Sequence, residues 1–166
     1  MKNLYPCLLT VLLFTLIVVP ASAFTAEKLV INVMDNGDAQ VTFDYELSWP
    51  ELISFSLVPQ KEQIIQSAIK SKFTAATVDT ISVSTTGTGL AIRNFAQRSD
   101  SAGVITYKTP AISFMIAKDL LNNYPLIANT ISPDFSPEET IVKFPGGRQY
   151  TYHEASGIPA ITCTVQ

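Results

Sequence analysis

The chain has 166 residues, with 11 Lys and Arg against 14 Asp and Glu and a formal net charge of −3. A mildly acidic chain without a basic run is not expected to bind nucleic acid. One histidine and two cysteines also exclude the spaced ligand sets that zinc sites require.

Residues 1–23 have the pattern of a secretory signal peptide. Met1-Lys2-Asn3 is a short positive start, Leu4 to Val19 is almost wholly apolar, and the small residues of Ala21-Ser22-Ala23 follow Pro20. The apolar run is shorter than the roughly 20 residues of a membrane-spanning helix. We expect cleavage after Ala23, no membrane span afterwards, and a secreted, extracellular or cell-envelope location. A retained anchor is the alternative.

Residues 24–166 would form one exported domain. Since Cys7 lies in the signal segment, only Cys163 survives cleavage and no intramolecular disulfide is expected. Cys163 alternates with Ile161 and Val165, which suggests a final edge strand whose apolar side chains point inward. We therefore expect a buried thiol that reacts slowly.

The first element is a hairpin around Asp35-Asn36-Gly37. Alternating apolar residues flank this acidic stretch, and a three-residue loop pairs Val33 with Ala39, Ile31 with Val41 and Leu29 with Phe43. All apolar side chains then lie on one face, and a one-residue slip would reverse that. Gly37 suits the left-handed third position of such a loop. Calcium would need more oxygen ligands, so a metal site is not expected.

Helical patterns come next. Ser48-Trp49-Pro50-Glu51 has the spacing of a capping box, and either a short helix through Phe55 or a strand ending fits residues 50–57. Residues 59–73 show a helical stripe that includes Ile64, Ile65 and Ile69. A second helix is predicted over residues 114–124 and ends at Pro125.

Between the two helices the pattern is that of strands. Residues 79–86 and 90–96 alternate, and Gly87-Thr88-Gly89 is expected to turn between them. A polar loop over residues 97–103 then leads to a strand at residues 104–108. Gly87-Thr88-Gly89 is not a phosphate loop, because no Lys-Ser/Thr follows it.

The last region repeats the logic of the first hairpin. After a polar connection at residues 132–137, a three-residue loop of Pro145-Gly146-Gly147 places Val142 and Phe144 on one face with Tyr150 and Tyr152. The fold class predicted for the whole is α+β. It is an antiparallel sheet of about six to eight strands built from hairpins, with two helices packed on one face.

No stretch of the sequence matches a catalytic, cofactor-binding or metal-binding motif. His153 beside Glu154 lacks a nucleophile motif, and the acids Asp134 and Glu138-Glu139 lie near prolines where solvated side chains are usual. Tyr150, Tyr152 and Trp49 could line a sugar-binding shelf, but parity favours the tyrosines as core residues. We therefore assign no catalytic, cofactor-binding or metal-ligating residue, and no cofactor.

Several short stretches spread over most of residues 24–166 resemble a set of small exported, uncharacterised proteins from methanogenic archaea. The resembling stretches are residues 30–33, 36–39, 47–49, 107–110, 132–138 and 143–146. None of them is a chemical motif. The resemblance implies export and an archaeal envelope, and no functional residue follows from it.

Three functions fit this sequence. The first is a non-catalytic exported cell-surface or binding domain of unknown ligand. The second is a structural subunit of an envelope assembly, joined to itself or to another envelope protein by strand addition through the alternating tail at residues 161–165. The third is an exported hydrolase. We expect the chain not to be an enzyme.

Overall fold

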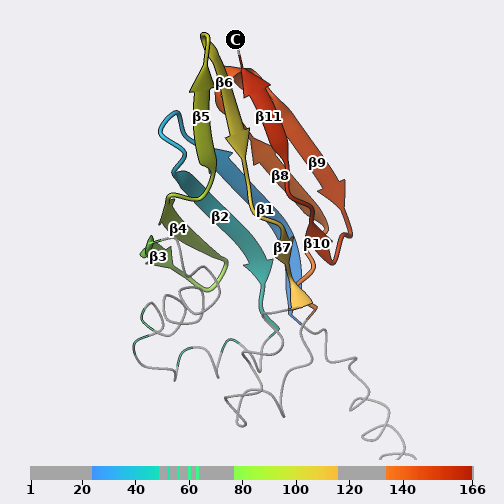
Figure 1. Cartoon of the computed structure of the whole chain (residues 1–166). Helices are drawn as coiled ribbons and strands as arrows, with labels where there is room; N and C mark the ends of the chain where they lie inside the picture. The colour runs from blue at the N-terminus through green and yellow to red at the C-terminus, as the bar shows by residue number, and fades with distance from the viewer. Residues whose placement is uncertain are drawn as a thin grey trace, which may run out of the picture.

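The computed structural model describes residues 24–48, 77–115 and 134–165, together with the single residues 52, 56, 60 and 63. Its main element is a six-stranded sheet in the order β3–β4–β2–β1–β8–β9 (Figure 1). The strands of this sheet are β1 (Thr25–Val33), β2 (Ala39–Glu46), β3 (Thr77–Val83), β4 (Gly87–Arg93), β8 (Glu139–Lys143) and β9 (Gln149–His153).

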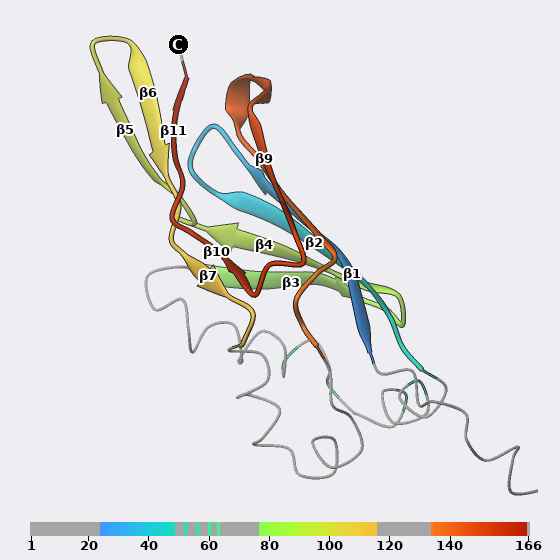
Figure 2. The same ribbon diagram turned by 90° about the vertical axis from the view of Figure 1, so that its right-hand side faces the viewer.

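A second layer lies over one face of this sheet. It is a three-stranded sheet in the order β11–β6–β5, and Figure 2 shows it as a separate layer beside the first. Its strands are β5 (Gln97–Ser101), β6 (Val104–Lys108) and β11 (Thr162–Val165). A small pair, β7 (Ile112–Ser113) with β10 (Gly157–Ile158), continues the layer, and a 3₁₀ turn η1 (Pro145–Gly147) joins β8 to β9.

One core cluster joins the two layers. It combines the inward side chains of the six-stranded sheet, such as Ile31, Val78 and Val142, with Tyr107 and Cys163 of the three-stranded sheet. These five side chains are at most 1% exposed. The fold is therefore a two-layer β-sandwich with a continuous interior.

The alternation of apolar residues predicted the register of the first hairpin correctly. Val33 pairs with Ala39, Ile31 with Val41 and Leu29 with Phe43. The loop has three residues, since Met34 N donates to Asp38 O at 2.8 Å, and Gly37 has a φ of +87°. The register is confirmed, and it places Leu29, Ile31, Val33, Ala39 and Val41 together in the core.

The predicted α+β class is wrong. The described elements form an all-β fold, and the face of the large sheet that was expected to hold two helices is covered by β6 and β11. The sheet is also mixed, because β1 and β8 run parallel. Most of residues 50–57, most of the helices predicted over residues 59–73 and 114–124, and all of the signal peptide over residues 1–23 lie outside the described residues.

The turn predicted at Gly87-Thr88-Gly89 is also wrong. The chain reverses at residues 84–86, where Ser84 N donates to Gly87 O at 2.8 Å. Gly87 belongs to β4 and lies so close to β2 that an added Cβ would be 3.1 Å from Phe43 O. Glycine here permits close approach of two strands, not reversal.

The polar loop predicted over residues 97–103 is a strand and a turn. β5 pairs with β6 along its whole length, from Gln97 with Lys108 to Ser101 with Val104. All five residues of β5 are exposed. Its polar sequence gave no alternation because neither face of this edge strand is buried.

Thr140 of β8 is 1% exposed, and its Oγ1 has no hydrogen-bond partner. Burying a hydroxyl without a partner costs about 1–3 kcal/mol. Thr140→Val keeps the shape and removes the polar atom, so we expect it to raise the free energy of unfolding by about 1 kcal/mol. Urea unfolding followed by circular dichroism measures this. A loss of stability would mean that the hydroxyl is satisfied in solution.

Candidate functional site

The candidate site is a crevice between two hairpin turns. Because β1 and β8 are parallel neighbours, their carboxyl ends lie at one end of the sheet, and each strand continues into a three-residue turn. The space between the turns is shallow and largely open to solvent, has a volume of about 400 Å³ and is lined by residues 32–36, Phe144 and Pro145. We call it the hairpin crevice.

The first wall, the β1–β2 turn, is held by both its own side chains and the rest of the fold. Asn36 Nδ2 donates to Asp38 Oδ2 at 2.7 Å, and Asp38 N donates to Asn36 Oδ1 at 3.0 Å. Ala96 N donates to Gly37 O at 2.8 Å, and Asn94 N donates to Asp38 Oδ1 at 2.8 Å. The turn is therefore bonded to the point where the chain passes from β4 into β5.

A third contact reaches this turn from the second layer. Tyr107 of β6 donates its hydroxyl to the Asp35 carbonyl at 3.1 Å. Its ring lies 6.4 Å from that of Phe144, which lines the other side of the crevice. One buried side chain thus contacts both walls.

The second wall is the β8–β9 turn. Phe144 N donates to Arg148 O at 2.8 Å, and Gly146 and Gly147 have φ values of +78° and +81°. Pro145 occupies the first position and Gly147 is left-handed, as predicted, while Gly146 is left-handed as well. Val165 of β11 packs against Gly146, where an added Cβ would be 2.9 Å from its Cγ1.

The crevice combines apolar surface with hydrogen-bonding groups. Met34 is 40% exposed, an unusual state for a large hydrophobic residue in this fold, and Pro145 and the ring of Phe144 continue the apolar part. Asp35 and Asn36 supply a carboxylate and an amide at the rim. Since none of the lining residues is cationic, the site suits a neutral or positively charged ligand with an apolar part.

A row of charged residues crosses the outer face of the sheet. Cross-strand pairing places Asp44 beside Lys28, Lys28 beside Glu139, and Glu139 beside His153. Lys28 Nζ lies 2.6 Å from Glu139 Oε2, and this hydrogen bond lowers the pKa of Glu139. The row is partly exposed to solvent, so it contributes mainly to the surface charge pattern.

Glu27 lies beside this row in a β-bulge between Ala26 and Lys28. Partial desolvation and the carboxylate of Glu46, followed by those of Glu138 and Asp44, raise the pKa of Glu27. In the described part of the chain, no group of three or more His, Cys, Asp or Glu side chains is arranged to hold a metal ion. The bulge is thus a site of like-charge repulsion.

The two glutamates give a prediction with opposite signs. Glu139 has a lowered pKa, so its stabilising contribution is present at neutral pH and is lost as the pH falls through its folded pKa. Glu27 has a raised pKa and is destabilising once deprotonated. We expect Glu139→Gln to lower and Glu27→Gln to raise the urea midpoint at pH 7. Both differences should vanish at acidic pH and shrink in high salt. If both substitutions changed the urea midpoint at pH 7 in the same direction, the opposite roles assigned to Glu139 and Glu27 would be wrong.

The other residues weighed from the sequence do not converge. Asp134 is exposed and accepts a local hydrogen bond from Ser136 N at 2.9 Å, away from the Glu139–His153 pair. Tyr150 and Tyr152 are half-buried against the core, with the Tyr150 ring 5.8 Å from that of Phe144. They therefore do not form an open shelf, and Trp49 lies outside the described residues.

No protein-family model, curated protein or solved structure matches this chain. From the sequence, Asp35 and Asn36 were weighed as part of a calcium site and assigned to a turn, and the other residues of the hairpin crevice were not singled out. The two turns were predicted, but nothing in either turn indicates that β1 and β8 are neighbours. The available sequence signal was Met34, an apolar residue that breaks the alternation just before an acidic turn.

Cys163 is the free thiol among the described residues and is 1% exposed. It points inward with Ile161, as predicted, and pairs with Tyr107 across β11 and β6. We expect a monomer on a denaturing, non-reducing gel and slow labelling by thiol reagents until urea unfolds the chain. A covalent dimer abolished by Cys163→Ser would contradict this.

Proposed function

We propose that the chain is an exported, non-catalytic binding domain of the cell surface or envelope, and that its ligand binds in the hairpin crevice. The observation that supports this most is that both walls of the crevice are hydrogen-bonded turns held by the rest of the fold: Ala96 N donates to Gly37 O of the first turn, and Val165 packs against Gly146 of the second. A rigid site loses little conformational entropy on binding. The proposal includes cleavage after Ala23 and the archaeal origin that the resemblance implies.

The composition of the crevice supports a ligand over a purely structural role. A methionine adapts its shape to different apolar groups, and Met34 remains 40% exposed although the adjacent Val33 is 3% exposed. Asp35 offers a carboxylate acceptor beside it, whereas the amide of Asn36 is bonded to Asp38. We therefore propose a neutral or cationic ligand, such as an uncharged glycan or a basic peptide.

No helix in the described part of the chain is long and apolar enough to cross a bilayer.

Amide NMR spectra recorded during titration with neutral oligosaccharides and with short basic peptides test this function. The expected result is a set of shifts confined to residues 32–36, 144 and 145. Met34→Lys should abolish the shifts, because it places a charge over the apolar part. Thr42→Lys on the exposed outer face of β2, opposite Val30 and away from the lining residues, is the matched control and should leave them unchanged.

Two results would overturn the proposal. The first is the absence of any shift with either ligand class, and the second is a set of shifts that maps to another surface. Hydrolysis of a probe during the titration would favour the third function, an exported hydrolase. The spectra report that outcome directly, because new product signals appear.

Assembly by strand addition is the second candidate. The tail expected to donate a strand, residues 161–165, is paired with β6 of its own chain, so donation of this tail would require its release. One observation still favours assembly. β9 and β11 each have a single neighbour among the described strands, and both lie on the side of the sandwich that faces the viewer in Figure 2.

A further inference from the structure

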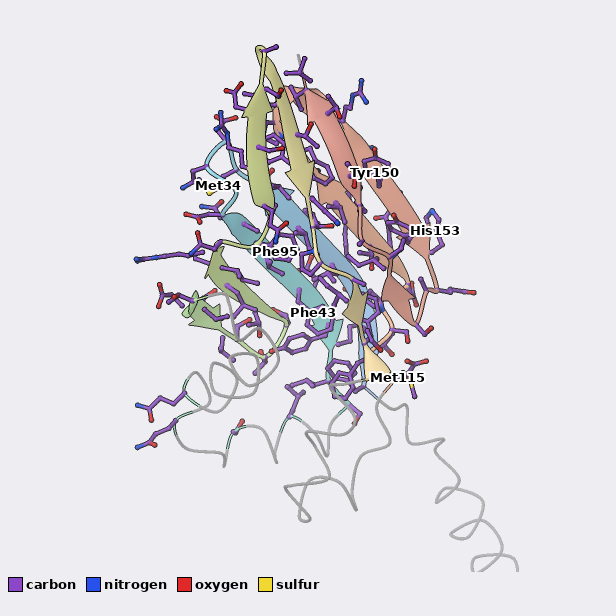
Figure 3. The ribbon with its side chains drawn as sticks, viewed as in Figure 1. Met34, Phe43, Phe95, Met115, Tyr150 and His153 are labelled. Carbon is purple, nitrogen blue, oxygen red and sulfur yellow. The ribbon has the colours of Figure 1, made fainter. Side chains whose placement is uncertain are left out.

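The free edge of β9 presents an ordered row of backbone groups. Phe144 N donates to Arg148 O, and Glu154 N donates to Glu138 O. Since bonding alternates along an antiparallel pair, the even-numbered residues from 148 to 154 direct their backbone groups toward β8. Gln149, Thr151 and His153 therefore direct theirs outward. Figure 3 shows β9 along the outer side of the sandwich, with Tyr150 and His153 labelled.

The edge of β5 is different. Thr109 N donates to Ile161 O, so the odd-numbered residues of β6 bond toward β11 and the even-numbered ones toward β5. By the register of β5 with β6, Arg98 and Asp100 are then the residues whose backbone groups point outward. Charged residues at such positions discourage strand addition, and these two lie 3.6 Å apart as an ion pair. The outward positions of β9 have no Lys, Arg, Asp or Glu.

The sequence of β9 and the residues that flank it are complementary to themselves. When a second β9 runs antiparallel to the first about Thr151, Gln149 faces His153 and Tyr150 faces Tyr152. Continued one residue beyond each end of β9, the same register places Arg148 opposite Glu154, and the two-fold axis produces this charge pair twice. All three outward residues then form hydrogen-bonded pairs, with two N–H···O bonds in each pair.

We propose that two copies of this chain pair through β9, antiparallel and centred on Thr151. Pairing joins the two six-stranded sheets into one continuous sheet, and a single surface patch meets its own copy, as a two-fold dimer requires. Charge complementarity selects the register, because a shift in either direction separates Arg148 from Glu154. The paired tyrosines add aromatic contact on the inner face.

The edge of β11 is a weaker alternative. Its outward backbone groups belong to Thr162 and Thr164, because Cys163 and Val165 bond toward β6. The β11 edge offers two outward residues instead of three, and the residues at its two ends do not form a pair of opposite charges. The proposed dimer rests on the second candidate function and is independent of ligand binding in the crevice. A strand-edge contact is small, so the dimer should be reversible and depend on concentration.

A cysteine at the two-fold axis is the sharpest test. Facing residues in a hydrogen-bonded pair have Cα atoms about 5.5 Å apart, within the range that a disulfide spans. Thr151→Cys should therefore oxidise to a covalent dimer under mild oxidant. Thr164→Cys, an exposed threonine on the edge of β11, is the matched control and should remain monomeric on a non-reducing gel.

Charge reversal tests the register without a covalent bond. Arg148→Glu, or Glu154→Arg, places like charges opposite each other twice, and sedimentation equilibrium should show dimerisation weakened about tenfold. The double variant Arg148→Glu with Glu154→Arg restores the pairing and should recover the wild-type constant. Failure of Thr151→Cys to cross-link, preferential cross-linking of Thr164→Cys, or a double variant no better than the singles would overturn the proposal. The NMR titration of the crevice reports on ligand binding separately.

Discussion

Replacing Gly37 with alanine is expected to cost about 2–4 kcal/mol of folding free energy. The residue has a φ of +87°, which costs an L-residue about 1–2 kcal/mol. The added Cβ would also lie 2.5 Å from Ala96 O. The contact can be relieved only by moving the turn away from Ala96, which breaks the Ala96 N to Gly37 O bond.

The structure provides a matched control for this substitution. Gly103 in the β5–β6 turn has a φ of +79°, but a Cβ added there would have no atom within 4 Å, and Gly147 is similar at +81°. Gly103→Ala and Gly147→Ala should therefore lose only the conformational part, about 1–2 kcal/mol. Urea unfolding of the three variants separates the two effects. Equal losses would show that contact with Ala96 is unimportant.

Replacing Tyr107 with alanine is expected to cost about 3–5 kcal/mol, as for other large buried aromatic residues. The side chain is 1% exposed and joins the second layer to the core of the first. Tyr107→Phe keeps the ring and loses only the bond to the Asp35 carbonyl, so it should cost about 1 kcal/mol. Lys108→Ala, at the exposed next position, is the control.

Thermal and urea unfolding measure these losses, and NMR adds a local readout. In Tyr107→Phe, the shifts should centre on Asp35 and the first turn, because the lost hydrogen bond ends there. A Tyr107→Phe variant as unstable as Tyr107→Ala would mean that the hydroxyl, not the ring, holds the layers together. That result would contradict the role of ring packing in joining the two sheets.

Local features were predictable from the sequence because their causes are local. The period-two alternation of apolar residues and a glycine at the third loop position determine the register of β1 with β2, in which Leu29 pairs with Phe43. The same reasoning applies to the β8–β9 turn. The strand β5 was missed because its pairing partner, not its own pattern, makes it a strand. Gly87 was misassigned because the close approach of β2 is a tertiary contact.

The candidate site was the least predictable part. The hairpin crevice exists because β1 and β8 are parallel neighbours, with Val30 paired to Ile141. Neither strand contains a signal for that pairing, since both would fit an antiparallel neighbour equally well. Periodicity identifies which side chains share a face of one hairpin, but not which hairpins share a sheet.

The pairing of β1 with β8 also has a consequence for the order of folding. The hairpin of β1 and β2 closes a loop of only three residues, whereas the other edge of β1 can pair only with residues 139–143, which are far away in the sequence. Contacts so distant in sequence form slowly, because a long loop must close first. During synthesis from the N-terminus, β1 would therefore remain unpaired on one side until residues 139–143 had been made.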